Sequence, residues 1–288
     1  MTTVGVIGLG DIGSGVAKAI PAAGLSLVVC DIAPAARAPF AAVATEAADP
    51  VELGASADVI IVAVVNDAQV LDVLDGERGA LASARAGSTV VIVSTVSVST
   101  VEQVAATAAL RGVRVVDCGV SGGPSAAAAG ELIAMVGGDE ATIDEIRPAL
   151  DAFSSLVVHM GALGTGLRAK LARNVVQYGS WLAAYEGQLL AEASGIELAR
   201  LAQVIRASDQ KIGGAATLMF RETVEPFGPD DDAGLVGAMR AAAGLAHKDL
   251  RAALALAADL DVELPLAELT DGGLARIFGV APPGSEAP

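Results

Sequence analysis

The sequence predicts an α/β domain built on a mostly parallel sheet, followed by an all-α domain that a long helix joins to it. Two observations lead to this fold class. Short apolar runs alternate with helical segments through the first half of the chain, which is typical of a parallel sheet covered by helices on both faces. The stretch Gly161–Gly195 then runs without proline through residues that mostly favour helix, and the segments after it are helical as well.

Composition narrows the class of protein. The chain has 288 residues, of which 53% are hydrophobic, and this is enough for two ordinary cores. Its net charge of −16 repels phosphate backbones and argues against nucleic acid as a partner. Cys30 and Cys118 lie far apart in apolar runs, which suggests neither a disulfide framework nor a metal cluster. No signal peptide or membrane-length apolar stretch is recognisable, so we expect a soluble, cytoplasmic protein that binds no membrane.

The chain begins with a strand, a glycine turn and a helix. An apolar run covers Thr3 to Leu9, and the helical segment after the turn ends at Gly24. The next run, Leu25 to Cys30, is expected to form a buried parallel strand. Asp31 stands at its end, eighteen residues after Gly13.

This arrangement matches the fingerprint of a dinucleotide-binding Rossmann domain. The glycines would let a pyrophosphate approach backbone N–H groups at the helix N-terminus, and Asp31 would accept hydrogen bonds from the adenosine ribose. The alternative is a glycine turn that merely lets the strand and the helix pack closely. The cofactor-binding residues expected here are Gly8, Leu9, Gly10, Asp11, Ile12, Gly13 and Asp31.

Further strands alternate with helices along this half of the chain. Ligands of such sheets lie beyond the carboxyl ends of the strands, so the loops at those ends are the ones expected to carry function. These loops are Val64-Val65-Asn66-Asp67, Ser94-Thr95-Val96 and the segment from Asp117 to Gly123. The strands are expected at Asp58–Val65, Thr89–Val93, Arg114–Val116, Leu132–Val136 and Leu156–His159, with helices from about Ala68 and Ser99.

Two of these loops have a double interpretation. Ser121 followed by Gly122 and Gly123 offers a hydroxyl and unshielded backbone N–H groups, which suit a carboxylate, but an ordinary glycine-rich turn has the same sequence. Thr95 either contacts the cofactor or, with Ser94, ends a strand and begins a helix.

The long helix carries a row of polar and aromatic side chains. Lys170, Asn174 and Tyr178 are four residues apart, and Trp181 continues the same stripe. Such a row could face a bound molecule, or it could be a solvated Lys-Asn pair beside a partly buried tyrosine. At about 1.5 Å per residue, this helix would be long enough to bridge two domains or two subunits.

The C-terminal half is expected to be helical. We predict helices over Leu198–Ala207, Gly214–Glu222 and Ala233–Leu260, an exposed loop over Glu225–Asp232, and a disordered tail over Ala281–Pro288. His159 should end a strand and His247 should pack on a helix, with no metal role for either. The side chains that could line an apolar pocket, or be ordinary core residues, are Tyr178, Trp181, Met219, Phe220 and Phe227.

Five motifs in this order resemble the β-hydroxyacid dehydrogenases, a group that includes 3-hydroxyisobutyrate dehydrogenase and the core of 6-phosphogluconate dehydrogenase. They are GLGDIGSG near the start, STV at 94–96, CGVSGG at 118–123, GALGTGLRAKLARN at 161–174 and HKDL at 247–250. The resemblance implies a Rossmann domain over residues 1–162 and a helical substrate and dimerisation domain over 163–288, whose connecting helix covers 163–194. It also implies a homodimer or homotetramer.

The resemblance also implies roles for individual residues. Lys170 would be the catalytic lysine and Asn174 would help to hold the substrate. The carboxylate of the substrate would be bound by Ser121, Gly122 and Gly123, with Tyr178 and Trp181 as further substrate contacts. Thr95 would lie near the nicotinamide, Lys248 would lie close to the cofactor, and Val64 and Val65 belong to the cofactor loop.

These residues predict an NAD(P)-dependent oxidoreductase that interconverts a small 3-hydroxycarboxylate and its semialdehyde or keto form. Lys170 would be the general acid/base, with its pKa lowered by burial or by a nearby positive charge such as Lys248. Asp31 favours NAD over NADP because its carboxylate would face the extra phosphate, although Arg37, six residues later, could approach one. The alternatives are an imine reductase-like enzyme, a class that generally lacks this lysine, and a dinucleotide-binding regulatory or scaffold protein without turnover.

Overall fold

The computed structural model describes residues 2–280, so the tail expected over 281–288 lies outside the described residues. The chain forms two compact units that divide after Arg173, within the long helix, whereas the domain boundary at residue 162 stays a prediction. No helix among residues 2–280 is long and apolar enough to cross a membrane.

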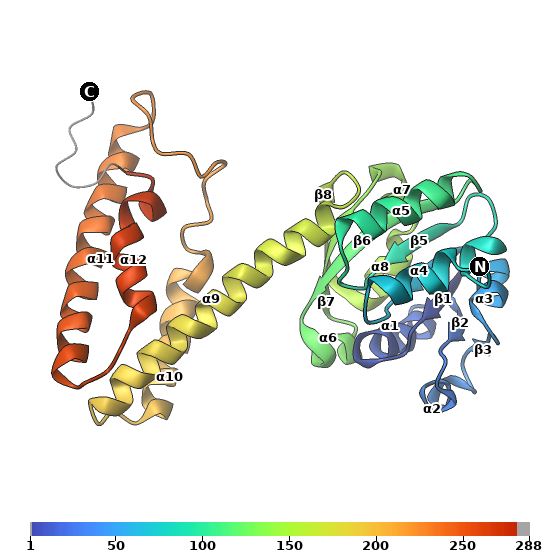
Figure 1. Ribbon diagram of the computed structural model, residues 1–288, viewed down its shortest axis with the longest axis horizontal. Coiled ribbons are helices and arrows are strands. Elements are labelled where there is room, and N and C mark those ends of the chain that lie inside the picture. The colour runs from blue at the N-terminus through green and yellow to red at the C-terminus, as the bar shows by residue number, and fades with distance from the viewer. Residues whose placement is uncertain (1, 281–288) are drawn as a thin grey trace. The chain divides into compact units, whose positions relative to one another are not determined.

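The first unit is built on one eight-stranded sheet with the strand order β3-β2-β1-β4-β5-β6-β7-β8 (Figure 1). All neighbouring strands are parallel except β6 and β7, which are antiparallel. The predicted Rossmann fold is therefore confirmed. The strands are β1 (Thr3–Ile7), β2 (Ser26–Cys30), β3 (Thr45–Glu46), β4 (Val59–Val62), β5 (Thr89–Ile92), β6 (Arg114–Ser121), β7 (Leu132–Gly137) and β8 (Ser154–Gly161).

Helices cover both faces of the sheet. On one face, Val16 and Ile20 of α1 and Leu150 of α8 are fully buried in a core with the strands; on the other, Leu53 of α3 and Val101 of α5 lie in a second core. The apolar strands are buried on both sides, which is why they read as continuous apolar runs. The helices are α1 (Asp11–Ala22), α2 (Pro34–Arg37), α3 (Pro50–Ser56), α4 (Asp67–Asp75), α5 (Val98–Ala109), α6 (Gly123–Ala129), α7 (Glu140–Glu145) and α8 (Arg147–Phe153), with 3₁₀ turns at Ala38–Phe40 and Ala80–Ala82.

Strand β6 is longer than the sequence indicates. We expected a strand over Arg114–Val116 followed by a loop, but the strand continues to Ser121. The reason is β7, which pairs antiparallel with this second half of β6, from Asp117 opposite Gly137 to Ser121 opposite Ile133. The prediction of a loop from residue 117 is therefore wrong, and Ser121 lies at a strand end.

Helix α9 (Thr165–Ala193) confirms the predicted long helix, and the rest of the second unit is helical as well. It contains α10 (Leu198–Ile212), α11 (Ala233–Asp259) and α12 (Pro265–Phe278), of which α12 was not predicted. Residues 225–232 contain no helix or strand and are exposed apart from Phe227, as expected of a loop.

The helix predicted over Gly214–Glu222 is wrong. Only a 3₁₀ turn forms, at Gly214–Ala216. Gly213 and Gly214 both have positive φ, 89° and 55°, which ends α10 in the left-handed region that glycine favours. The Thr217 hydroxyl then donates to the carbonyls of Ile212 (2.6 Å) and Gly214 (2.7 Å), so local side-chain bonds replace a helical ladder.

A buried carboxylate holds the start of α9. Asp117, on β6, is completely buried, and its Oδ1 and Oδ2 accept hydrogen bonds from the N–H groups of Gly164 (2.6 Å) and Leu167 (2.7 Å). Burial raises the pKa of Asp117, while these backbone donors act in the opposite direction. The acid therefore supplies acceptors to N–H groups that a helix N-terminus leaves unpaired.

We predict that Asp117→Ala lowers the free energy of unfolding by about 3 kcal/mol, because two buried N–H groups lose a charged acceptor. The matched control is Asp139→Ala, which removes the exposed cap of α7 that accepts from Thr142 N–H at 3.0 Å, and it should cost about 1 kcal/mol. Urea unfolding of the full chain measures both. Equal losses for the two variants would contradict a special role for Asp117.

Candidate active site

The predicted cofactor residues meet at one edge of the sheet. The glycine loop follows β1, Asp31 follows β2, Val64 and Val65 follow β4, and Thr95 follows β5. Because these strands are parallel neighbours, all four segments lie at their carboxyl ends. Two backbone hydrogen bonds extend the ladders into this edge, from Gly8 N–H to Cys30 O (3.0 Å) and from Ala63 N–H to Ile7 O (2.9 Å).

The three fingerprint glycines, Gly8, Gly10 and Gly13, differ in whether the packing of the protein requires a glycine. A Cβ on Gly8 would lie 2.7 Å from the Ala63 carbonyl oxygen, and one on Gly13 would lie 1.9 Å from the Gly8 oxygen, so close packing alone requires both. A Cβ on Gly10 would meet nothing within 4 Å, and its φ of −67° suits any residue. Packing within the protein therefore does not explain Gly10. An open position at the start of α1 fits a pyrophosphate that must approach the backbone closely.

Asp31 is bound to the glycine loop. Its Oδ2 accepts a hydrogen bond from Leu9 N–H (2.7 Å) and its Oδ1 accepts one from Ala33 N–H (2.8 Å). A carboxylate oxygen can accept a second hydrogen bond, so both can still receive a ribose hydroxyl. The glycine loop and the end of β2, which the sequence spacing related to each other, are therefore in contact.

Two fully accessible apolar side chains flank this edge. Ile32, directly after Asp31, is 99% exposed, and Val65, after β4, is 81% exposed. Such side chains are unexplained by the fold and fit the faces of a flat ligand such as adenine. The sequence analysis named Val65 but missed Ile32, although a lone isoleucine directly after the strand-ending acid was a usable signal.

Asp67, which the sequence analysis named only as part of a loop, joins the loops after β4 and β5. Its Oδ1 accepts hydrogen bonds from the backbone N–H (2.9 Å) and hydroxyl of Ser97 and from the Thr100 hydroxyl. These bonds, the one from the Ser97 hydroxyl first, lower the pKa of Asp67 to about 2. The carboxylate therefore fixes the start of α5, just after the exposed Thr95.

Lys170 lies against β6, next to the predicted carboxylate-binding segment. A Cβ on Gly119 would lie 2.6 Å from Lys170 Cβ, so the helix and the strand touch at this glycine. The Lys170 ammonium donates a hydrogen bond to the carbonyl of Val120, the residue before Ser121. Burial first, and the charge of Arg173 second, lower the pKa of Lys170. The structure thus brings Lys170 and Ser121 together.

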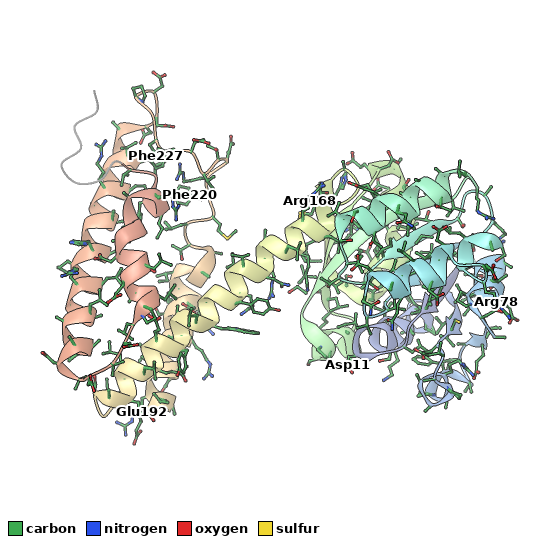
Figure 2. The ribbon with its side chains drawn as sticks, in the orientation of Figure 1. Asp11, Arg78, Arg168, Glu192, Phe220 and Phe227 are labelled. Atoms are coloured by element: carbon green, nitrogen blue, oxygen red, sulfur yellow. The ribbon has the colours of Figure 1, made fainter. Side chains whose placement is uncertain are left out.

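Close helix contacts connect this segment to the cofactor edge. Gly122 and Gly123 both have positive φ, 121° and 70°, so the turn itself requires them, as the alternative interpretation held. A Cβ on Gly15 of α1 would lie 2.5 Å from the Ala127 carbonyl carbon of α6, and one on Gly164 would lie 2.9 Å from Val98 Cγ1 of α5. Arg168 of α9 lies 4.0 Å from Glu102 of α5 (Figure 2).

The other predicted site residues belong to the second unit. Asn174 follows Lys170 by one turn of α9, and Tyr178 and Trp181 are exposed, with ring centroids 5.2 Å apart. Lys248, on α11, is exposed and forms an ion pair with Asp249 (3.1 Å). The interpretation as core residues is wrong for Tyr178, Trp181, Met219 and Phe220, which are all exposed, whereas Phe227 is partly buried, with the Arg221 guanidinium 4.3 Å from its ring centre.

The two histidines have structural partners. His159 lies within β8, two residues before its end, and its Nε2 is 2.9 Å from the carbonyl oxygens of Gly138 and Gly161. His247, on α11, contacts α12, with its Nδ1 2.6 Å from Asp271 Oδ1. It therefore makes the helix contact that the sequence indicated.

These features define a dinucleotide-binding protein: a mostly parallel sheet, an open position at Gly10, and Asp31 hydrogen-bonded to the glycine loop at the end of β2. The partly buried Lys170 lies in the same unit. Comparison with known proteins agrees. Residues 3–161 match the model of the NAD binding domain of 6-phosphogluconate dehydrogenase. Residues 164–277 match that of the NAD-binding domain of NADP-dependent 3-hydroxyisobutyrate dehydrogenase.

Relatives span nearly the whole chain. An uncharacterized oxidoreductase of Mycobacterium tuberculosis is 41% identical over 283 residues, 98% of this chain and 95% of the relative. A solved structure from Mycobacterium avium 104 has a TM-score of 0.88 at 38% identity and covers 96% of this chain and 98% of its own. The 3-hydroxyisobutyrate dehydrogenase of M. tuberculosis, solved with L-serine, has a TM-score of 0.67 at 28% identity, covering 96% and 93%.

This chain belongs to the β-hydroxyacid dehydrogenase family and is an NAD(P)-dependent dehydrogenase. The resemblance inferred from its motifs is confirmed. A Streptomyces aurantiacus imine reductase also has a TM-score of 0.72, covering 96% of this chain and 94% of its own, but at 20% identity this likeness shows the shared fold alone.

We predict that Gly10→Ala and Gly13→Ala act on different properties. Gly10→Ala should keep the melting temperature within about 2 °C and weaken NADH binding about tenfold or more, because its methyl group enters the open space expected to hold the pyrophosphate. Gly13→Ala should destabilise the fold, because its methyl group meets the Gly8 carbonyl. Thermal unfolding and NADH fluorescence titration separate the two. Unchanged NADH affinity in a folded Gly10→Ala variant would show that no ligand approaches this position.

Proposed function

We propose that the protein is an NAD-dependent dehydrogenase that interconverts a small 3-hydroxycarboxylate and its semialdehyde or keto form, with Lys170 as the general acid/base. One observation carries the proposal. The Lys170 amino group, with its pKa lowered by burial, is held at the Val120 carbonyl beside Ser121. It lies in the same compact unit as the glycine loop and Asp31.

The proton chemistry follows from the position of Lys170. In the oxidation direction, its neutral amine takes the proton of the substrate hydroxyl as the carbon–hydrogen bond breaks and the carbonyl forms. A nicotinamide bound at the glycine loop and Asp31 would supply the acceptor for the hydride. In the reverse direction the Lys170 ammonium returns the proton to the forming alkoxide, a contribution of about 10²- to 10⁴-fold in rate. The Val120 carbonyl accepts one N–H bond of Lys170 and so fixes the orientation of the amino group. This orientation serves both the oxidation and the reduction.

Recognition of the substrate carboxylate falls to the end of β6 in this proposal. The Ser121 hydroxyl and the N–H groups of Gly122 and Gly123 would bind it, which would hold the 3-hydroxyl group next to Lys170. The relative crystallised with L-serine, itself a 3-hydroxycarboxylate, supports this substrate class. The roles of Asn174, Tyr178, Trp181 and Lys248 stay predictions from the sequence.

NAD is the proposed cofactor because of Asp31. Its carboxylate, held by Leu9 and Ala33, stands where a ribose would bind and would repel the additional phosphate of NADP. The matched 3-hydroxyisobutyrate dehydrogenase model is described as NADP-dependent, so the preference of this chain has to be measured directly.

Turnover tests the proposed reaction. Nicotinamide absorbance should change when the purified chain receives NAD and a small 3-hydroxycarboxylate, and in reverse with NADH and a semialdehyde. Cyclic imines in the same panel test the imine reductase alternative. Retained cofactor binding with no turnover across the panel would instead favour a regulatory protein.

We predict that Lys170→Met lowers kcat at least about 100-fold without lowering the melting temperature. A buried charge with a lowered pKa disfavours the folded state below that pKa, and methionine removes this cost. In the wild type, oxidation should rise with pH through the pKa of Lys170, which lies below its usual 10.5, and reduction should fall over the same range. Lys211→Met, on exposed α10, is the control. Wild-type turnover in Lys170→Met would refute the mechanism.

The proposed assembly is a homodimer or homotetramer. The second unit exposes many large apolar side chains, a composition that water disfavours and that interfaces cover. They include Val175, Tyr185, Val204, Ile205, Ile212, Val224 and Leu269. Light scattering on the full chain should give at least twice the mass of 28.5 kDa, and Val204→Glu with Ile205→Glu should reduce it. A monomer at micromolar concentration would refute the assembly.

A further inference from the structure

The cation Arg37 lies next to Asp31, the residue proposed to bind the ribose. The Arg37 guanidinium, at the end of α2, donates a hydrogen bond through its Nη1 to the backbone carbonyl of Asp31. On its other side, its Nε lies 3.3 Å from Glu46 Oε2. The Arg37 side chain is 23% exposed and that of Glu46 is 42% exposed, so water reaches the pair but Arg37 is largely enclosed.

The fold fixes this arrangement. Glu46 is the last residue of the short edge strand β3, where it stands opposite Val29 of β2, and the next residue, Ala47, donates its N–H to the Val29 carbonyl at 3.0 Å. This pairing sets Glu46 beside Val29, which lies two residues before Asp31 near the end of β2. Arg37 is bound between these two strand ends, and both of its contacts are made with atoms of this edge.

The charges of this edge are unfavourable to an added phosphate. Arg37 contacts the backbone carbonyl of Asp31 and the carboxylate of Glu46. Asp49 is already paired with Arg78, whose position Figure 2 labels. The pKa of the buried Cys30 thiol, at the end of β2, reflects the charges around this edge. Burial first, and then the charges of Asp49, Asp31 and Glu52, raise its pKa to about 11, against the lowering effect of Arg37. A phosphate with a charge of about −1.5 to −2 would thus meet mainly carboxylates.

We propose that Glu46 is a specificity-determining residue, which selects NAD by holding the Arg37 guanidinium in an ion pair and so withholding it from the 2′-phosphate of NADP. This inference rests on the proposed NAD preference and adds a second carboxylate to it. Asp31 repels the phosphate, and Glu46 neutralises Arg37, which contacts the backbone of Asp31. Without Glu46, the Arg37 Nε donor that now faces its carboxylate would be available to the phosphate.

The test is direct binding of NADPH and NADH to the full chain, followed by nicotinamide fluorescence, so that it does not depend on a known substrate. Glu46→Ala should tighten NADPH binding about fivefold, the effect of one exposed ion pair, and change NADH binding less than about twofold. The gain should shrink at high salt, because exposed charges are screened.

Two further variants assign the gain to Arg37. Arg37→Ala alone should weaken NADPH binding, because it leaves the Glu46 carboxylate without its cation, whereas Glu46→Ala with Arg37→Ala should lose the gain of Glu46→Ala. Glu145→Ala is the matched control, because it breaks the ion pair of Glu145 with Arg114, far from this edge at the start of β6, and should change neither affinity. Melting temperatures verify folding.

The outcomes separate the two proposals. If wild-type protein binds NADH no better than NADPH, the proposed NAD preference fails. If folded Glu46→Ala binds NADPH no better than wild type, or if Glu46→Ala with Arg37→Ala keeps the gain, the role of Glu46 is refuted. Absence of binding for both dinucleotides would refute the cofactor site itself.

Discussion

The hydrogen bonds from the start of α9 to the buried Asp117 carboxylate are the interaction on which the rest of the first unit depends. They join β6, in the middle of the sheet, to the helix that carries Lys170. A lysine has a long flexible side chain, so its ammonium can be placed only if its backbone is fixed. Asp117 supplies that fixed point three residues before Lys170, at Leu167, and without competition from water, because it is completely buried.

Glycines make this contact possible by letting backbones approach. A Cβ on Gly137 would lie 2.4 Å from Asp117 Oδ1, and one on Gly166 would lie 2.4 Å from the Met135 carbonyl oxygen. At Gly119, the missing Cβ is what admits Lys170. Side chains at these three positions would push α9 away from the sheet and move the lysine away from Val120. The same principle recurs in the second unit, where buried Glu186 of α9 accepts hydrogen bonds from the N–H groups of Leu266 (2.6 Å) and Ala267 (3.0 Å) at the start of α12.

The sequence predicted those parts of the fold and site that depend on local spacing. The glycine loop, Asp31 and the long helix are encoded by residues close together in the chain. Their signals are the spacing of the glycines and Asp31 and a long stretch of helix-favouring residues without proline. The second half of β6 could not be predicted, because its strand conformation comes from pairing with β7 and not from its own polar and glycine-rich composition. Asp117 was missed for a similar reason, since its partners are 47 and 50 residues away. The helix expected at Gly214 failed because two consecutive glycines adopted positive φ, which local propensity does not reveal.

Asp117 and Lys170 lie close together in the structure but do not pair with each other, which matters for the proton transfer that we propose for Lys170. A carboxylate paired with Lys170 would stabilise its ammonium and raise its pKa. Asp117 instead directs both oxygens to backbone N–H groups of α9, and Lys170 donates to the uncharged carbonyl of Val120. Burial and the like charge of Arg173 then act on Lys170, and both favour its neutral form. The acid thus positions the helix without stabilising the ammonium of Lys170, as the general acid/base role that we propose for this lysine requires.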